Sequence, residues 1–216
     1  IVGTGERPEM TGKSFAALLF DGTNLAEYKP RDYVLTGRER HTHARPDNLG
    51  YPSRAIRNSN YLYIWNIKPE RWPAGNPMPP GTKENTPNAP FRKLWPGYHD
   101  VDDSPSKSFL LKHKMDFENQ FAIAFSKRPG EQLYDVQKDP ACTVNLAEEE
   151  GYQQIKFELR DRLKIKLKEQ KDPRILGYGD IFESYPRISS MRMFPGFRQA
   201  GVYNPAFLQD GQVTIK

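Results

Sequence analysis

The sequence predicts a protein of the α/β class, in its α+β form, in which short strands and one long amphipathic helix are separated by long irregular loops. Residues 152–170 repeat apolar side chains at the spacing of a helix that is apolar on one side. Residues 53–67 contain two strand-like runs around an Asn-Ser-Asn turn. The 19 prolines and 16 glycines indicate that much of the chain is irregular. Because the apolar side of the helix must be covered, we expect it to dock on a sheet.

The composition argues against three classes of protein: nucleic-acid-binding, membrane-spanning and disulfide-stabilised. The 216 residues are enough for one large domain or two small ones, and 37% hydrophobic residues is low for a self-contained globule of that size. The formal net charge of +5 is a mild bias, and the chain lacks the motifs and the dense Lys/Arg stripe typical of nucleic-acid-binding proteins. No apolar run approaches the ~18 residues of a membrane span. Cys142 is the single cysteine, so the chain has no disulfide framework of its own.

The first third of the chain is predicted to start inside a longer protein and to contain a helix and three strands. The segment Ile1–Gly5 reads like the interior of a protein, so we expect an N-terminal part outside this sequence. Residues 14–19 follow a Ser/Thr cap and are predicted to form a short helix, and residues 32–36 a strand. Residues 61–67 are apolar on both faces, which predicts a central strand covered on both sides.

The middle of the chain is rich first in proline and then in helix signals. Residues 69–105 have no periodicity but contain large aromatic side chains, including Trp72 and Trp95, so we expect a long loop held against a surface. Residues 106–125 are predicted to be helical, either as one helix or as two. Residues 131–136 are predicted to form a short strand that ends in a Lys-Asp-Pro turn.

The clearest helix of the sequence covers residues 152–170. Leu159, Leu163 and Leu167 follow Ile155 at four-residue intervals, charged residues fill the other sides, and an Asp-Pro pair ends the helix. We interpret its lysines and arginines as a solvated face rather than as a binding patch.

A basic cluster follows the first predicted strand. The nine residues Gly37–Arg45 contain three arginines and two histidines. Guanidinium groups bind oxyanions through two parallel hydrogen bonds, and imidazoles donate or transfer protons near neutral pH. The cluster therefore predicts a site for an anionic group. Two alternatives stay open at this point: a solvated basic loop, and histidines that cap local backbone carbonyls.

Several segments resemble the C-terminal end of sulfatases. Residues 131–140, E-Q-L-Y-D-V-Q-K-D-P, followed by N-L-A at residues 145–147, resemble the signature E-L-Y-D-L-x-x-D-P-x-E-x-x-N-L-A, which joins a last strand, a turn and the terminal helix. Residues 8–15 resemble the p-x-x-M-x-G-x-S-L helix that follows the large catalytic sheet. Residues 36–45 are similar to a segment of heparan N-sulfatase-like bacterial members, and residues 52–64 to the strand pair that follows it.

The resemblance implies a fold similar to the alkaline-phosphatase superfamily, whose smaller C-terminal subdomain is a four-stranded antiparallel sheet with one long helix. It implies four regions here: the end of the catalytic α/β domain at 1–68, a Pro-rich loop at 69–105, the C-terminal subdomain at 106–173 and an irregular aromatic-rich tail at 174–216.

The chain departs from the family at the nucleophile. Sulfatases use a Cys or Ser in C/S-x-P-x-R, which becomes formylglycine; Gly50–Arg54 imitates this motif with a glycine in the nucleophile's position, and Cys142 lacks the following Pro and Arg. We therefore expect no catalytic residue in this chain, with calcium and formylglycine in the missing N-terminal part. Asp102-Asp103 is interpreted as a solvated turn rather than a calcium site. Zinc on His41 and His43 lacks a third ligand at useful spacing.

What the resemblance implies for function is a hydrolase of sulfate esters, or of N-sulfate, on sugars, located in the periplasm or outside the cell. This chain would contribute substrate-binding residues: His41 and His43 as hydrogen-bond donors to the sulfated sugar, Arg40 and Arg45 as charge partners, and Arg54 and Arg57 as weaker candidates. The expected partners are the sulfated sugar and the missing catalytic portion or an oligomer partner, with no nucleic acid and no membrane span.

An alternative function needs no nucleophile. In it, the chain is a non-catalytic binding module for acidic glycans, whose basic residues hold the anionic groups while Trp72 and Trp95 stack on sugar rings. This alternative predicts that the apolar surfaces are buried within the chain, whereas a sulfatase fragment leaves some of them uncovered.

Overall fold

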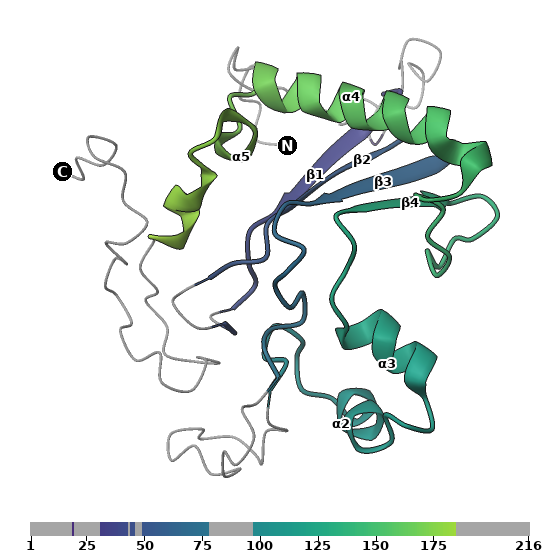
Figure 1. The fold of residues 1–216 in the computed structure, drawn as a ribbon, viewed down its shortest axis with the longest axis vertical. Helices are drawn as coiled ribbons and strands as arrows, with labels where there is room; N and C mark the ends of the chain where they lie inside the picture. The colour runs from purple at the N-terminus through teal and green to yellow at the C-terminus, as the bar shows by residue number, and fades with distance from the viewer. Residues whose placement is uncertain (1–18, 20–30, 43, 46–48, 78–96, 185–216) are drawn as a thin grey trace. The chain divides into compact units, whose positions relative to one another are not determined.

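The computed structural model describes residues 31–42, 44–45, 49–77 and 97–184, together with Leu19 (Figure 1). The chain divides into two compact units, Ile1–Asp32 and Tyr33–Lys216, and all the elements below belong to the second unit. These elements are β1 (Val34–Arg38), β2 (Ser53–Arg57), β3 (Tyr61–Asn66), α2 (Pro105–Lys112), α3 (Glu118–Phe125), β4 (Glu131–Asp135), η2 (Glu150–Tyr152), α4 (Gln153–Glu169), α5 (Pro173–Leu176) and η3 (Gly179–Glu183). The helix predicted at 14–19, apart from Leu19, and the tail beyond residue 184 lie outside the described residues.

The four strands form one antiparallel sheet in the order β1-β2-β3-β4. This sheet and its long helix confirm the architecture that the resemblance implied. The first strand was predicted two residues too early, at 32–36, because its pairing with β2 continues into the first residues of the basic cluster, where Arg38 lies opposite Ser53. The central position predicted for β3 is confirmed, since it pairs with β2 on one side and β4 on the other.

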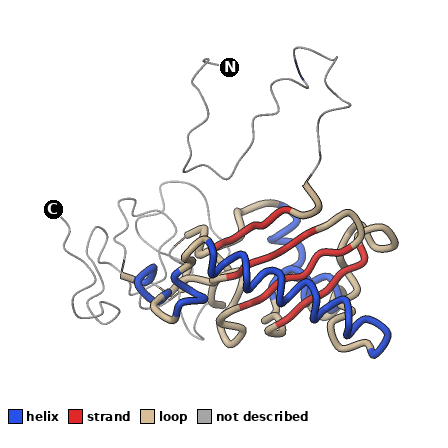
Figure 2. The backbone as a smooth tube through the Cα atoms, turned by 90° about the horizontal axis from the view of Figure 1, so that it is seen from above, coloured by secondary structure: helices blue, strands red, loops and turns tan. Residues whose placement is uncertain are grey.

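One face of the sheet is covered by α4, which lies along it (Figure 2). Ile56, Tyr63 and Leu133 occupy matching positions on neighbouring strands, so their side chains share this face. They form one buried cluster with the leucine stripe of α4: Leu159, Leu163 and Leu167. Burying each such side chain contributes about 1.5–3 kcal/mol, so this contact supplies much of the fold's stability. The prediction that the amphipathic helix docks on a sheet is confirmed.

The opposite face of the sheet lacks a complete apolar layer. On β3, Leu62 and Ile64 point to this face and are only half-buried. The position paired with Ile64 on β4 is Gln132, a polar residue, so the neighbouring strand supplies no apolar partner there. Because Ala55, Gln132 and Tyr134 on this face are nevertheless buried, our expectation that β3 is covered on both faces is confirmed in full on the α4 side and in part on the other.

The two described ends of the Pro-rich segment are held against α2 and α3. An isolated bridge joins Pro77 to Gly97. The Tyr98 ring lies 4.9 Å from that of Phe125 and 5.9 Å from that of Trp72, between ring centroids. The Lys107 ammonium donates to the Tyr98 carbonyl oxygen at 3.1 Å. The prediction of a loop held against a surface is thus confirmed for these two ends, while residues 78–96, including Trp95, lie outside the described residues.

Candidate functional site

The basic cluster lies where β1 ends and the chain turns toward β2. Two buried carboxylates from distant parts of the chain, Asp100 and Glu183, hold this loop in place. Because the described part of the loop is irregular, its backbone has few partners of its own, and the carboxylates and arginines supply them.

Asp100 binds the middle of the loop. Its Oδ1 accepts hydrogen bonds from the backbone N–H and the hydroxyl of Thr42, at 2.6 and 2.8 Å. Its Oδ2 accepts from Nη2 of Arg45 at 2.6 Å and lies 3.4 Å from Nη2 of Arg38. Burial opposes ionisation of Asp100, but the Arg45 charge and the hydrogen bonds from Thr42 outweigh it and hold the pKa of this carboxyl below its usual range. Asp100 is therefore a carboxylate at neutral pH.

Glu183 binds both ends of the loop and is fully buried. Its Oε2 accepts from the backbone N–H of Gly50 at 2.6 Å and from Nη2 of Arg40 at 3.1 Å. Its Oε1 accepts from Nη1 of Arg71 at 2.7 Å and from Nη2 of Arg174 at 3.1 Å. Three guanidinium groups and one amide thus converge on one carboxylate, so the buried negative charge of Glu183 is fully compensated.

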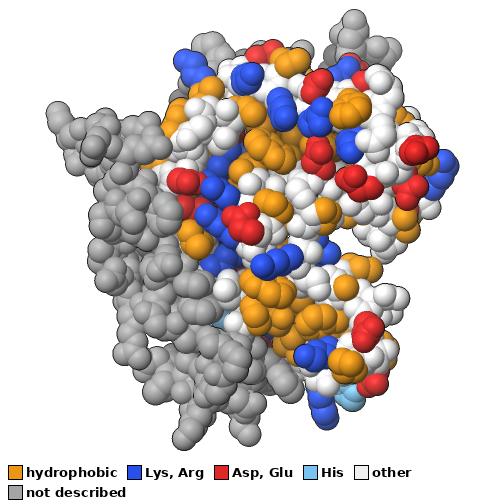
Figure 3. Space-filling view, in the orientation of Figure 1, with side chains coloured by type: hydrophobic (Ala, Val, Ile, Leu, Met, Phe, Trp, Pro, Cys, Tyr) orange, Lys and Arg blue, Asp and Glu red, His pale blue; other side chains and the backbone are white. Residues whose placement is uncertain are grey.

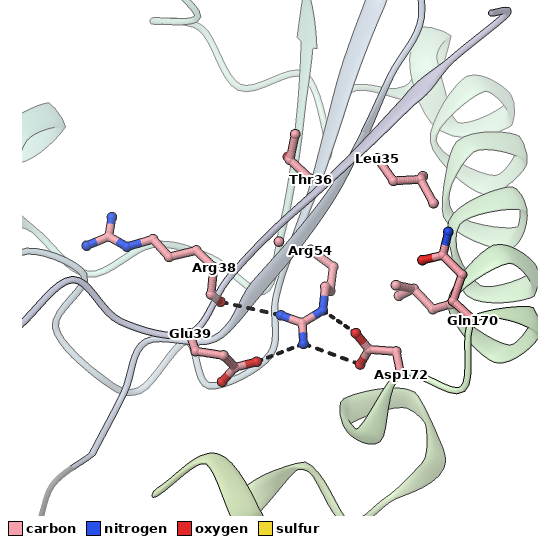
Figure 4. Close-up of a pocket in the computed structure, with 9 residues that line it drawn as sticks. Leu35, Thr36, Arg38, Glu39, Arg54, Gln170 and Asp172 are labelled. Carbon is pink, nitrogen blue, oxygen red and sulfur yellow. Dashed lines mark hydrogen bonds and ion pairs between the residues drawn. The ribbon is translucent and has the colours of Figure 1, made fainter. Parts of the chain in front are cut away.

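Glu39 links this network to the end of α4. Its carboxylate lies 2.7 Å from Nη2 of Arg54 and 2.7 Å from Nη2 of Arg174. Nε of Arg54 in turn donates to Oδ2 of Asp172, at 2.7 Å, and Figure 4 shows the Arg54 guanidinium between the two carboxylates. Glu39, Arg54 and Asp172 border a hollow of about 320 Å³ between β1 and the end of α4, and Leu35 and other residues of both elements also line it.

The structure gives the predicted substrate-binding residues different surroundings. His41 is exposed, and its Nδ1 lies 3.2 Å from the Asp100 carbonyl oxygen, so the ring has one backbone contact and an accessible edge. Arg40, Arg45 and Arg54 are engaged in the ion pairs above, with side-chain exposures of 16%, 1% and 7%. His43 lies outside the described residues.

Sequence reasoning missed the acidic half of this network. Glu39 was within the cluster but was not assigned a role, and Asp100, Asp172 and Glu183 were not considered as partners of the arginines. Each of these three lies 55 to 143 residues from the arginines of the loop and β2 that it contacts. No local pattern marks such partners. The one hint in the sequence is that Gly37–Arg45 contains three arginines but a single acidic residue, Glu39, so partners from elsewhere in the chain are needed.

Gly50, the glycine of the motif that imitates the sulfatase nucleophile, is required by packing. A Cβ added at Gly50 would lie 2.6 Å from the Glu39 carbonyl oxygen, closer than real contacts allow. The close approach of the two backbones allows a hydrogen bond, in which the Tyr51 N–H donates to the Glu39 carbonyl oxygen at 2.6 Å. A Cys or Ser side chain does not fit at this position, which supports the interpretation that the motif is accidental.

Within the described ranges, no three His, Cys, Asp or Glu side chains come together as a metal site would require. Asp103 instead pairs with Lys107 at 3.1 Å. In the same ranges no helix is both long and apolar enough to cross a membrane.

Comparisons with known proteins give matches among solved structures alone, since no family model and no curated protein matches this chain. Solved structures of sulfatases resemble it. A 2-O GAG sulfatase is 19% identical in sequence with a TM-score of 0.42. A candidate sulfatase from Bacteroides thetaiotaomicron is 19% identical with a TM-score of 0.43. Each comparison covers 79% of this chain and 23% of the solved protein, so the chain spans about a quarter of the length of either structure.

Proposed function

We propose that this chain is the C-terminal part of a sulfatase-family hydrolase that acts on sulfate esters or N-sulfate of sugars. The observation that carries the proposal is the signature at residues 131–147. The signature implies a strand, a turn and then the terminal helix, and the structure has β4, a turn and α4 in this order.

The polar residues of the signature each have a defined task in that turn. The Asp135 carboxylate accepts from the N–H groups of Gln137 and Lys138, at 3.2 and 3.1 Å, which turns the chain as β4 ends. Oδ1 of Asn145 accepts from the N–H of Leu133 at 2.8 Å and so ties the loop back to the strand. These contacts explain why Asp and Asn stand at these two positions. A match that arose by chance would not be expected to place both residues in turn-forming hydrogen bonds.

A second observation agrees with a chain that is part of a larger protein. Around α2 and α3, large apolar side chains are exposed: Phe109 at 48%, Met115 at 72% and Ile123 at 46%. Figure 3 shows hydrophobic side chains gathered on this face near the two helices. Exposed apolar groups of this size are typical of a surface that another part of a protein covers.

The role we propose for the chain is substrate binding. His41 would donate a hydrogen bond to the sulfated sugar from its accessible edge, together with His43. Arg40, Arg45 and Arg54 stay predicted charge partners of the sugar's anionic groups, and their ion pairs give the loop a fixed shape from which to act.

The chemistry of sulfate release is assigned to residues outside this chain. Formylglycine would replace a Cys or Ser, and Gly50 has no room for either. We therefore derive no catalytic step on these residues. The proposed location, in the periplasm or outside the cell, follows from the same resemblance.

The alternative, a binding module for acidic glycans, has less support. Its stacking residue Trp72 packs against the Tyr98 ring at 5.9 Å, and the Lys127 ammonium lies 5.3 Å from the centre of the Trp72 ring. A half-buried indole that is engaged in this way offers little free ring to a sugar.

The proposal is tested by the release of inorganic sulfate from sulfated monosaccharides, using the longest protein encoded by the gene. We expect His41→Gln to lower kcat/KM by about tenfold, as expected for one hydrogen bond to a charged group. Lys168→Gln, at an exposed position on α4, should leave kcat/KM unchanged. No sulfate release from any sulfated sugar would refute the proposed activity, and equal effects of the two substitutions would refute the role of His41.

A further inference from the structure

A second hollow, of about 260 Å³, lies on the face of the sheet that α4 does not cover. Its walls come from the ends of β1 to β4, from α3 and from the two described ends of the Pro-rich loop. The lining residues that matter here are Arg38, Tyr51, Asn66, Asp100, Arg128 and Gln132. None of these six residues belongs to the predicted substrate-binding set.

Tyr51 is the first sign of a binding function. The residue is 4% exposed, and its hydroxyl has no hydrogen-bond partner within the part of the chain that the structure describes. Buried hydroxyls almost always have a partner, because an unpaired one loses its bonds to water without replacement. Burial raises the pKa of Tyr51 to about 12, so the phenol is a protonated donor at neutral pH.

The charged groups around Tyr51 are mostly positive. Arg128, Arg45 and Arg38 lie close enough to favour its phenolate electrostatically, and the Glu70 carboxylate opposes them more weakly. The Arg38 side chain is 45% exposed and makes a long contact of 3.4 Å with Asp100, so its guanidinium is accessible. The guanidinium carbon of Arg45 lies 5.7 Å from the centre of the Tyr51 ring, and its buried Nη1 also has no partner among the described residues.

The one carboxylate that lines the hollow, Asp100, is already neutralised. It accepts hydrogen bonds from Arg45 at 2.6 Å and from the Thr42 backbone N–H at 2.6 Å. The charges left to act on a ligand are therefore those of Arg38 and Arg128, although the Arg128 guanidinium also donates to the carbonyl oxygens of Ala122 and Ile123 in the last turn of α3.

The remaining polar wall is held in a fixed orientation. The Asn66 amide donates to Oε1 of Gln132 at 2.9 Å and to the Pro129 carbonyl oxygen at 2.7 Å. The Gln132 amide nitrogen donates to the Tyr134 hydroxyl. Because these amides need no ligand to be satisfied, the hollow keeps its shape when empty, and its volume suits one small polar group rather than a drug-sized molecule.

We propose that this hollow binds an oxyanion, a sulfate or carboxylate group of a small polar molecule, with the Tyr51 hydroxyl as hydrogen-bond donor and the Arg38 and Arg128 guanidinium groups as counter-charges. The inference rests on the unpartnered hydroxyl and the surrounding cations, and it requires no sulfatase chemistry. Its failure and that of the proposed function are therefore separate outcomes.

The test is an NMR titration of the ¹⁵N-labelled chain with sodium sulfate and with sodium glucuronate, at constant ionic strength so that general screening does not change. We expect saturable shifts of the Tyr51, Ser53 and Gln132 amides. Saturation by sulfate alone identifies a sulfated ligand, and saturation by glucuronate alone a carboxylate ligand. No saturable shift at these amides with either salt overturns the proposal.

Two variants and a control assign the binding to the hollow. Tyr51→Phe keeps the ring but removes the donor, and Arg38→Gln removes an accessible charge; each should weaken binding about tenfold or more. Lys168→Gln removes an exposed positive charge on α4 and should leave binding unchanged.

The thermal unfolding midpoint separates this role from a structural one. Tyr51→Phe removes an unpaired buried group, so its midpoint should be equal to or above that of the wild type while binding is lost. Unchanged affinity in both Tyr51→Phe and Arg38→Gln would overturn the proposal.

Discussion

Replacing Glu183 by Gln tests whether its carboxylate is what holds the basic loop. Each carboxylate oxygen accepts from two donors: Oε1 from Arg71 and Arg174, and Oε2 from Gly50 and Arg40. A glutamine keeps the shape but has one acceptor oxygen. In either orientation, its NH₂ group would face two donors.

The expected loss follows from the burial of these charges. The Glu183 side chain is fully buried, and those of Arg40 and Arg71 are 16% and 11% exposed. Removing one partner from a buried ion pair costs about 3–5 kcal/mol, because the remaining charge stays buried without compensation. Since domains of this size are stable by about 5–15 kcal/mol, Glu183→Gln should lower the free energy of unfolding by a large fraction.

The assay is urea unfolding followed by far-ultraviolet circular dichroism. Hydrogen exchange at the Gly50 amide, which donates to Glu183, gives a local readout if the variant opens without global unfolding. Glu169→Gln, which breaks an exposed pair with Lys166, is the matched control and should leave the urea midpoint unchanged. A loss below about 1 kcal/mol for Glu183→Gln, with unchanged exchange at Gly50, would refute the reasoning, since exposed pairs contribute that little.

Two further predictions concern the same loop. Gly50→Ala places a Cβ 2.6 Å from the Glu39 carbonyl oxygen and should cost about 1–3 kcal/mol in urea unfolding, whereas Gly151→Ala, with open space around its Cβ, should not destabilise. Asp100 has a lower pKa in the folded than in the unfolded state, so its stabilisation is present above the ordinary Asp pKa of about 3.9 and is lost as the pH falls through the folded value. Asp100→Asn should therefore flatten the acid dependence of the unfolding free energy; an unchanged slope below about pH 4 would contradict this.

The elements that the sequence predicted well are those whose cause is local. The leucines of α4 repeat at helical spacing, and the structure buries Leu159, Leu163 and Leu167 on the sheet. The hairpin of β2 and β3 turns at residues 58–60, where the Asn58 side chain accepts from the Asn60 and Tyr61 N–H groups. Both patterns depend on neighbours within a few positions, and a single sequence displays them.

For residues 106–125 the sequence predicted helix but did not decide between one helix and two. The structure ends α2 at Lys112, with His113 as its C-cap, and begins α3 at Glu118. Across the break, Phe109 and Phe117 meet with ring centroids 5.1 Å apart, a contact between two separate helices that no periodicity in the sequence displays.

The roles of the arginines were decided by the tertiary structure. The cluster at 37–45 correctly marked a concentration of cations, but whether each guanidinium meets a ligand or a carboxylate depends on residues far along the chain. Arg45 meets Asp100, and Arg40 meets Glu183, which is 143 residues away. The hollow around Tyr51 forms in the same way, from strand ends and a helix that no local pattern connects. Periodicity and turn chemistry act between neighbours and can be read from the sequence. Cavities and long-range ion pairs form only when folding brings distant segments together. Burial then strengthens the attraction between the paired charges, because the protein interior has a lower dielectric constant than water.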